Sequence, residues 1–163
     1  MKLIIKNKLM SIGGASTVKD ENENDLFIVK GKVFTITKKK IIYDMDGNKL
    51  FTVRNKFWRV FTNSAYIYDA SGKKIARLKD RFSRKATYLS EGFEETFRIG
   101  KNPNGRGKCI YKNEEEIGVW CNMKLHLVDT YEIEYKRNED ASIIVALVIA
   151  IDNIQDKNLE DVM

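Results

Sequence analysis

Proline, histidine and cysteine are scarce in this sequence. Its 163 residues include one proline (Pro103), one histidine (His126) and two cysteines, Cys109 and Cys121. Pro103 falls in a predicted loop, so the predicted strands contain no proline that would break them. The cysteines form no C-x-x-C pair, and one histidine cannot complete a zinc site with them. We therefore expect two free thiols, with a disulfide between them as the alternative, and no metal and no cofactor.

Long hydrophobic runs are also absent. The most apolar segment is Ala141–Ile151, which as a helix would span roughly 16 Å, about half of a bilayer core. The apolar stretch near the N-terminus, Leu3–Ile5, is far shorter than the core of a signal peptide. These lengths predict a cytoplasmic protein that is either free or bound peripherally to a membrane.

Positive charge exceeds negative charge. There are 29 lysines and arginines against 23 acidic residues, a formal net charge of +6. Such an excess suits anionic partners, although a solvated lysine-rich surface gives the same balance. The length suits one domain with a sizeable core.

Short apolar or alternating segments recur through residues 2 to 136, separated by turn residues about every ten positions. This pattern predicts a mainly β fold, either a barrel or a sandwich. The expected strands are Leu3–Ile5, Leu26–Val29, Val33–Ile36, Ile41–Tyr43, Leu50–Arg54, Ala65–Tyr68, Ile75–Lys79, Ala86–Leu89, Thr96–Ile99, Lys108–Tyr111, Ile117–Cys121 and Tyr131–Tyr135.

An internal repeat supports this interpretation. Residues Ile42–Arg54 align with Ile67–Lys79, and each copy is a strand, an Asp-x-x-Gly turn and a second strand. Aspartate can accept local N–H groups in such a turn, and glycine tolerates positive φ. A weaker copy is Cys109–Gly118. We interpret the copies as β-hairpins around a common core.

Alternation within the second strand of each copy assigns its two faces. Phe51 and Val53 match Ala76 and Leu78, and this set is expected to face inward. The intervening side chains form a basic outward stripe, whose members are Thr52, Arg54, Arg77 and Lys79, continued by Arg81.

The apolar segment is expected to be a buried helix near residues 140–153. A helix that is apolar on every side must be surrounded by protein, and a barrel of about twelve strands is too wide to be filled by its own side chains. Asn138, Glu139 and Asp140 would cap the helix. Asp152 and Asn153 are expected to return the chain to water, leaving 1–153 as the domain and 154–163 as a polar tail.

Two stretches carry a family resemblance. Phe27–Lys40 with Ile42–Leu50, and later Tyr66–Lys79, resemble the LURP-one-related family, and the apolar C-terminal segment agrees in order and spacing. This family is similar to the tubby C-terminal domain and to phospholipid scramblases. The resemblance implies a closed antiparallel barrel of about twelve strands around a buried C-terminal helix. Because tubby relatives bind phosphoinositide headgroups through basic surface residues, it also implies by analogy a lipid-binding or scaffold role.

Motifs for catalysis are weak, and we expect no enzyme. The loop Asn102–Cys109 lacks the first glycine and the final Ser or Thr of a phosphate-binding loop. His126 lies between leucines with no nucleophile at a known spacing. The acidic pair Glu94–Glu95 and the run Glu114–Glu116 lie beside turns, where charges are usually solvated, although scattered carboxylates leave an enzyme as one alternative.

Basic residues give the best binding signal. Several cations near a surface attract an anionic phospholipid or phosphoinositide. The candidate headgroup residues are Lys38, Lys39, Lys40, Arg54, Arg77, Lys79 and Arg81, with Arg84 and Lys85 adjoining. Phe57 and Trp58 are candidates for an interfacial wedge or for the core.

Two other kinds of partner follow from the same residues. Aromatics interleaved with basic residues can stack on nucleic acid, but alternation in a barrel produces this pattern automatically, so we expect no nucleic acid. A protein-interaction module that uses loops such as Gly100–Gly107 is the alternative to lipid recognition.

Overall fold

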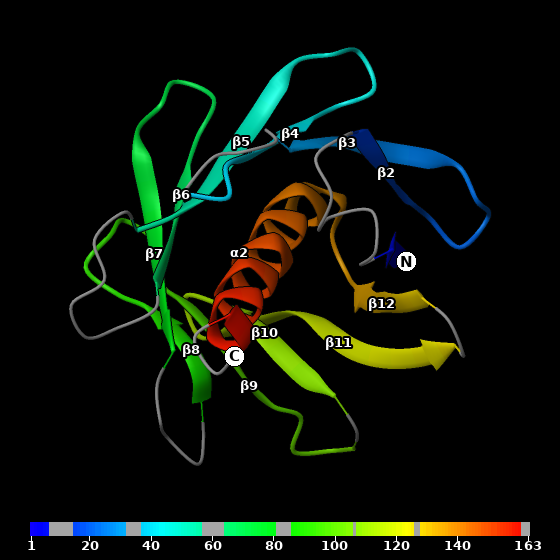
Figure 1. The fold of residues 1–163 in the computed structure, drawn as a ribbon. Helices are drawn as coiled ribbons and strands as arrows, with labels where there is room; N and C mark the ends of the chain where they lie inside the picture. Colours follow the sequence, from blue (N-terminus) through cyan, green and yellow to red (C-terminus); the bar gives the residue numbers. More distant parts are fainter. Residues whose placement is uncertain are drawn as a thin grey trace.

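Twelve antiparallel strands close into one barrel around a long helix (Figure 1). The computed structural model describes residues 1–6, 15–31, 37–56, 64–80, 86–105, 107–125 and 128–160. The strands are β1 (Lys2–Lys6), β2 (Ala15–Lys19), β3 (Asp25–Gly31), β4 (Lys40–Tyr43), β5 (Lys49–Asn55), β6 (Ser64–Tyr68), β7 (Lys74–Asp80), β8 (Ala86–Ser90), β9 (Phe97–Lys101), β10 (Lys108–Lys112), β11 (Glu115–Leu125) and β12 (Val128–Tyr135). A short 3-10 helix, η1 (Asn138–Asp140), leads into helix α2 (Ala141–Glu160). The predicted mainly β fold and central helix are confirmed.

Neighbours in sequence are neighbours in the barrel, and β1 closes it by pairing with both β2 and β12. The expected strands correspond to observed ones with two exceptions. Residues 33–36 lie outside the described residues, and β2 was not expected. Its sequence, Ala-Ser-Thr-Val-Lys, has one large apolar residue, Val18, which is buried together with Ser16.

The internal repeat forms two equivalent hairpins, β4–β5 and β6–β7. The Asp44 carboxylate accepts the backbone N–H of Asn48 at 2.8 Å, and Asp69 accepts that of Lys73 at 2.9 Å. Gly47 and Gly72 close the turns with φ of 86° and 90°. Glycine adopts this conformation at little cost.

A third turn of this kind joins β2 to β3, where no repeat was expected. Asp20 accepts the backbone N–H of Asn24 at 2.9 Å, just as Asp44 does for Asn48. The position of the glycine is taken by Glu23, with φ of 65°. Because the glycine is missing, the sequence pattern hides this copy.

Each of these hairpins contains a β-bulge at the same place. Ile67 faces Ala76 and Tyr68 faces Lys74, so Ile75 has no partner on β6. The equivalent extra residues are Leu26, Leu50 and, in the β10–β11 hairpin, Ile117. All are apolar and either pack against the core or lie within it. The weaker repeat at Cys109–Gly118 is thereby confirmed as a hairpin of the same design.

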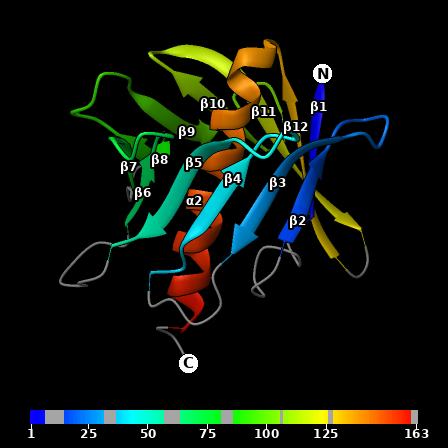
Figure 2. The same ribbon diagram turned by 90° about the horizontal axis from the view of Figure 1, so that it is seen from above.

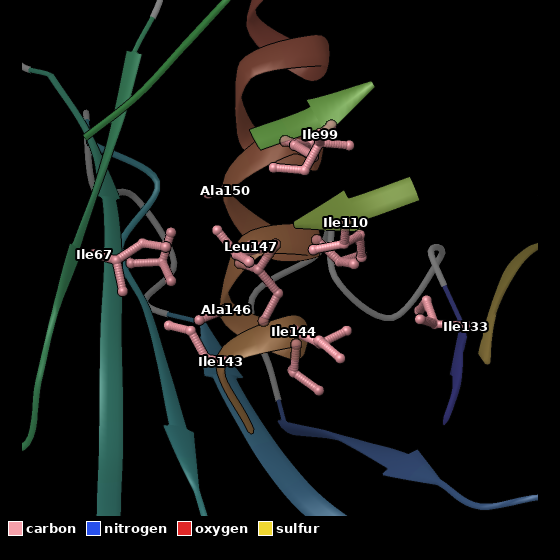
Figure 3. Packing of buried hydrophobic residues seen from close by; sticks show 14 of the residues in the cluster. Ile67, Ile99, Ile110, Ile133, Ile143, Ile144, Ala146, Leu147 and Ala150 are labelled. Atoms are coloured by element: carbon pink, nitrogen blue, oxygen red, sulfur yellow. The ribbon is translucent and has the colours of Figure 1, made fainter. Parts of the chain in front are cut away.

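Helix α2 fills the barrel. Every residue from Ile144 to Ile151 is fully buried. In Figure 3, Ile67 lies on one side of the helix and Ile99, Ile110 and Ile133 lie on the other. Gly118 permits close packing on β11, because a Cβ there would lie 3.3 Å from the Ile144 side chain. Burial on all faces overrides the low helix propensity of Ile and Val.

The predicted end of the helix at Asn153 is wrong. Helix α2 continues to Glu160, through most of the segment expected to be a polar tail, and runs along the whole barrel (Figure 2). Asp152 and Asn153 do not reach water, because they are 2% and 0% exposed.

Polar groups from the barrel wall explain this extension. Lys40 Nζ lies 3.5 Å from Asp152 Oδ2, and the Tyr131 hydroxyl donates to Asp152 Oδ1 at 3.3 Å. Asn55 Nδ2 donates to the Asn153 carbonyl at 3.0 Å. Buried polar side chains with such partners can continue a helix inside the barrel.

Candidate binding surface

Three of the predicted headgroup residues lie together on the outer face of β5 and β7. Arg54 and Lys79 are exposed and Arg77 is half-buried, while Val53, Ala76 and Leu78 face the core. The faces assigned by alternation are therefore confirmed.

Tyrosines of β6 lie between these cations. Tyr66 pairs with Arg54 on one side and with Arg77 on the other, which separates the two arginine Cα atoms by two strand spacings, about 10 Å. The Arg54 guanidinium donates to the Tyr68 hydroxyl from Nη2 at 2.7 Å and from Nε at 3.1 Å. Lys74 Nζ lies 4.3 Å from the centre of the Tyr66 ring. We call this set the β5–β7 outer surface: Arg54, Tyr66, Tyr68, Lys74, Arg77 and Lys79.

The cations of the β5–β7 outer surface have no acidic partner within 4 Å among the described residues. Some cations on other described strands are paired with acidic residues. Lys112 lies 2.8 Å from Glu95 and Arg98 lies 3.2 Å from Glu114. In addition, the buried Nε of Arg77 has no hydrogen-bond partner. Four cations without an acidic partner in the described structure thus lie together on this surface.

One contact of this surface has a structural counterpart elsewhere. In three hairpins a cation covers the tyrosine that precedes the turn. Arg54 covers Tyr68, Lys30 covers Tyr43 at 5.1 Å and Arg98 covers Tyr111 at 3.8 Å. This repetition indicates that Arg54 helps to pack the outer face. Arg77 and Lys79 have no such counterpart and remain the better candidates for binding.

The lysine run Lys38–Lys40 lies beside the Arg54 segment of β5, at the level of the C-terminal half of α2: Lys40 pairs with Val53, and the Asn55 N–H donates to the Thr37 carbonyl at 2.7 Å. The Lys38 carbonyl accepts from Asn153 Nδ2 at 3.1 Å. Lys38 and Lys39 are both half-buried. Lys40, which was expected in a turn, begins β4 and lies inside the barrel beside Asp152, so its predicted place among the surface cations is wrong; the buried carboxylate of α2 draws its amine inward.

Several candidates lie outside the described residues. These are Arg81, Arg84 and Lys85 of the predicted basic stripe, the aromatic pair Phe57 and Trp58, and His126. Their predicted roles stay predictions.

The clustered carboxylates form surface ion pairs. Glu94 pairs with Lys73, Glu115 with Arg137 and Glu116 with Lys136, at 3.3 to 3.5 Å. Exposed pairs of this kind are ordinary solvated contacts. The part of the chain that the structure describes holds no cluster of three metal-ligating side chains.

The phosphate-loop candidate, Asn102–Cys109, ends in strand β10. No helix N-terminus follows it to hold a phosphate. Cys109 and Cys121 are free thiols, as expected, and burial raises the pKa of the Cys109 thiol.

Another lysine lies at the inner side of the wall. Lys108 Nζ lies 5.2 Å from the centre of the Tyr88 ring and 5.3 Å from that of Trp120. Burial lowers the pKa of Lys108, and the charge of Asp80 opposes this effect.

Sequence reasoning missed Tyr66, Tyr68 and Lys74 as members of the surface. The repeat contained the signal for the tyrosines. In a hairpin, residues of β6 that alternate with buried Ala65 and Ile67 share the outer face with Arg77. Lys74 could not be placed in this way, because the bulge at Ile75 shifts the register.

Comparison with known proteins places the chain in one family. Residues 1–152 match the model of the LURP-one-related family. No curated protein and no solved structure matches. Among the described residues, no helix has both the length and the apolar character to cross a membrane. The matched range covers β1–β12 and most of α2, and by this match the chain belongs to the LURP-one-related family, as its residues indicated.

Proposed function

We propose that this protein is a non-enzymatic binding module whose β5–β7 outer surface takes anionic phospholipid headgroups. The observation that carries the proposal is the grouping of Arg54, Lys74, Arg77 and Lys79 without acidic partners in the described structure. The family's similarity to the tubby domain supports the same kind of ligand. The module would act peripherally, at the cytoplasmic face of a membrane.

Charge and aromatic character both favour a lipid surface. A basic residue near an anionic leaflet contributes about 1 kcal/mol. Tyrosine suits the headgroup level of a bilayer because its ring is apolar and its hydroxyl is polar. The ring centres of Tyr66 and Tyr68 lie 6.4 Å apart, between the cations. A headgroup bound here would therefore meet both positive charge and aromatic rings.

Sedimentation with vesicles tests the proposal. We expect binding to phosphatidylserine vesicles, no binding to phosphatidylcholine vesicles, and loss of binding at high salt. Arg77→Glu combined with Lys79→Glu should weaken binding roughly a hundredfold, because two near-surface charges are reversed.

A matched variant controls for net charge. Lys112→Glu with Lys136→Glu makes the same change at two cations that already pair with glutamates, and it should weaken binding much less. Equal losses in the two double variants, or binding that ignores salt, would contradict a specific surface. A stoichiometric protein partner that resists high salt would favour the alternative protein-interaction role.

A further inference from the structure

The ladder between β7 and β8 is shorter than those of the preceding repeats. In each repeat we compare the residue two positions after the bulged one. In β3 this residue is Ile28, where pairing with β4 begins, and in β5 it is Thr52, where pairing with β6 begins. The equivalent residue of β7 is Arg77, yet β7 pairs with β8 only at Lys79 and Asp80. Within the described residues, Lys74–Leu78 therefore lacks a strand partner on that side.

The side chain of Ser90 takes the place of a ladder partner for Arg77. Its hydroxyl accepts the backbone N–H of Arg77 at 2.9 Å, in place of a ladder carbonyl, and Ser90 is fully buried. Beyond this point the described residues form no further β7–β8 ladder pair. A backbone edge with unused hydrogen-bonding groups is a template for a further strand.

A pocket lies between the start of β7 and the chain after β8. It has a volume of about 360 Å³ and is lined by Lys73, Lys74, Ile75, Phe93, Glu94 and Glu95. Ile75 and Phe93 are half-buried and supply its apolar part. This volume is at the lower end of the range for ligand pockets and suits an apolar side chain beside the edge of β7.

The charges around the opening favour an acidic occupant. Glu94 and Glu95 are already paired with Lys73 and Lys112. Lys74 and Arg77 have no acidic partner in the described structure, and each lies against the Tyr66 ring. A strand added beside β7 would place alternate outward side chains next to these cations.

We propose that the edge of β7 at Lys74–Leu78 binds an extended acidic peptide of a partner protein, which adds as a short strand and places an apolar side chain against Ile75 and Phe93. Main-chain hydrogen bonds supply affinity in this mode, and the pocket supplies selectivity. The inference goes beyond headgroup binding and does not rest on it.

Titration of isotope-labelled protein with a peptide of alternating valine and glutamate tests the proposal. Backbone amide resonances of Lys74–Leu78 and of Phe93–Glu95 should shift. N-methylation of alternate peptide amides should weaken binding roughly tenfold, the equivalent of about 1.4 kcal/mol. A peptide of alternating valine and lysine should also bind more weakly.

Two variants separate this site from its alternatives. Phe93→Asp should abolish peptide binding and leave vesicle binding intact. The control, Met45→Asp, makes the same change at an exposed apolar residue in the β4–β5 turn, away from this pocket, and should leave both unchanged. The proposal is overturned if the peptide binds without shifts in β7, or if the N-methylated peptide binds equally well. It is also overturned if no peptide binds, or if lipid vesicles or a second copy of the chain produce the Phe93 shifts instead.

Discussion

At the scale of single residues, Lys40 of β4 and Asp152 of α2 form a buried ion pair that links the barrel wall to the helix. Lys40→Met would leave the Asp152 carboxylate buried without the ammonium beside it. Removing one partner of a buried ion pair costs about 3–5 kcal/mol. We expect a loss of this size in the free energy of unfolding, measured with urea.

The double variant Lys40→Met with Asp152→Leu should recover much of that loss, because no charge is then left buried. Lys39→Met, one position away and half-buried, serves as the control and should cost less than about 1 kcal/mol. A Lys40→Met protein as stable as the parent would show that the pair does not hold α2.

The turn aspartates predict how stability depends on pH. Hydrogen bonds from turn side chains and backbone amides lower the pKa of Asp20, Asp44 and Asp69. Their folded pKa values lie below the unfolded value near 3.9, so the stability they contribute is present above about pH 4 and lost as the pH falls through the folded values.

Asp44→Asn with Asp69→Asn should flatten the decline of stability below about pH 4, since asparagine can still accept these hydrogen bonds but does not titrate in this range. Urea unfolding across the acid range measures this slope. Asp46→Asn, within the Asp44 turn, is the control and should keep the parental slope. If the double variant also keeps it, the turn carboxylates are not the titrating groups.

At the scale of elements, the hairpin turns offer a matched pair of substitutions. Glu23 holds φ of 65° where the equivalent turns have Gly47 and Gly72. Glu23→Gly should stabilise the protein by up to about 1 kcal/mol, because the left-handed conformation costs a non-glycine residue about that much. Gly47→Ala should destabilise it by a similar amount, since no atom lies within 4 Å of the added Cβ and only the backbone conformation is penalised. Thermal unfolding of both variants checks the signs, and a destabilised Glu23→Gly protein would contradict the equivalence of the turns.

An element can be predicted from the sequence when the residues that determine it lie close together in the chain. The hairpins at Asp44 and Asp69 were predictable because an aspartate and a glycine define each turn. Strand β2 was missed because Ser16 takes a core position where an apolar residue was expected. The end of α2 was missed because the partners of Asp152 lie far away, at Lys40 and Tyr131.

The binding surface could likewise be predicted only where neighbouring residues determine it. Alternation placed Arg54, Arg77 and Lys79 on one face, and the structure agrees. Lys40 was included among the surface cations because Lys38–Lys40 was predicted to be a turn, although Lys40 begins β4 and pairs with Asp152 inside the barrel. Register also decided the position of Lys74 and where β7 stops pairing with β8, and register is fixed by bulges that local sequence does not reveal.

At the scale of the whole molecule, the barrel depends on α2 to fill it. Ile144→Asp places a charge among fully buried side chains and should abolish the cooperative fold. Ile41→Asp is the matched control, because Ile41 lies on the outer face of β4 and is half-buried. Circular dichroism and thermal unfolding distinguish the two variants. A folded, soluble Ile144→Asp protein would refute a central role for α2.

The central claim is that α2 is the permanent core of the barrel and that binding takes place on the outside. Hydrogen exchange of the α2 amides, measured with and without phosphatidylserine vesicles, tests this claim most directly. We predict that the amides of Ile144–Ile151 exchange only through global unfolding, equally slowly in both conditions, while protection increases on β5–β7 when vesicles are present. Loss of protection in α2 when vesicles are added would contradict the account, because it would mean that the helix leaves the barrel for the membrane.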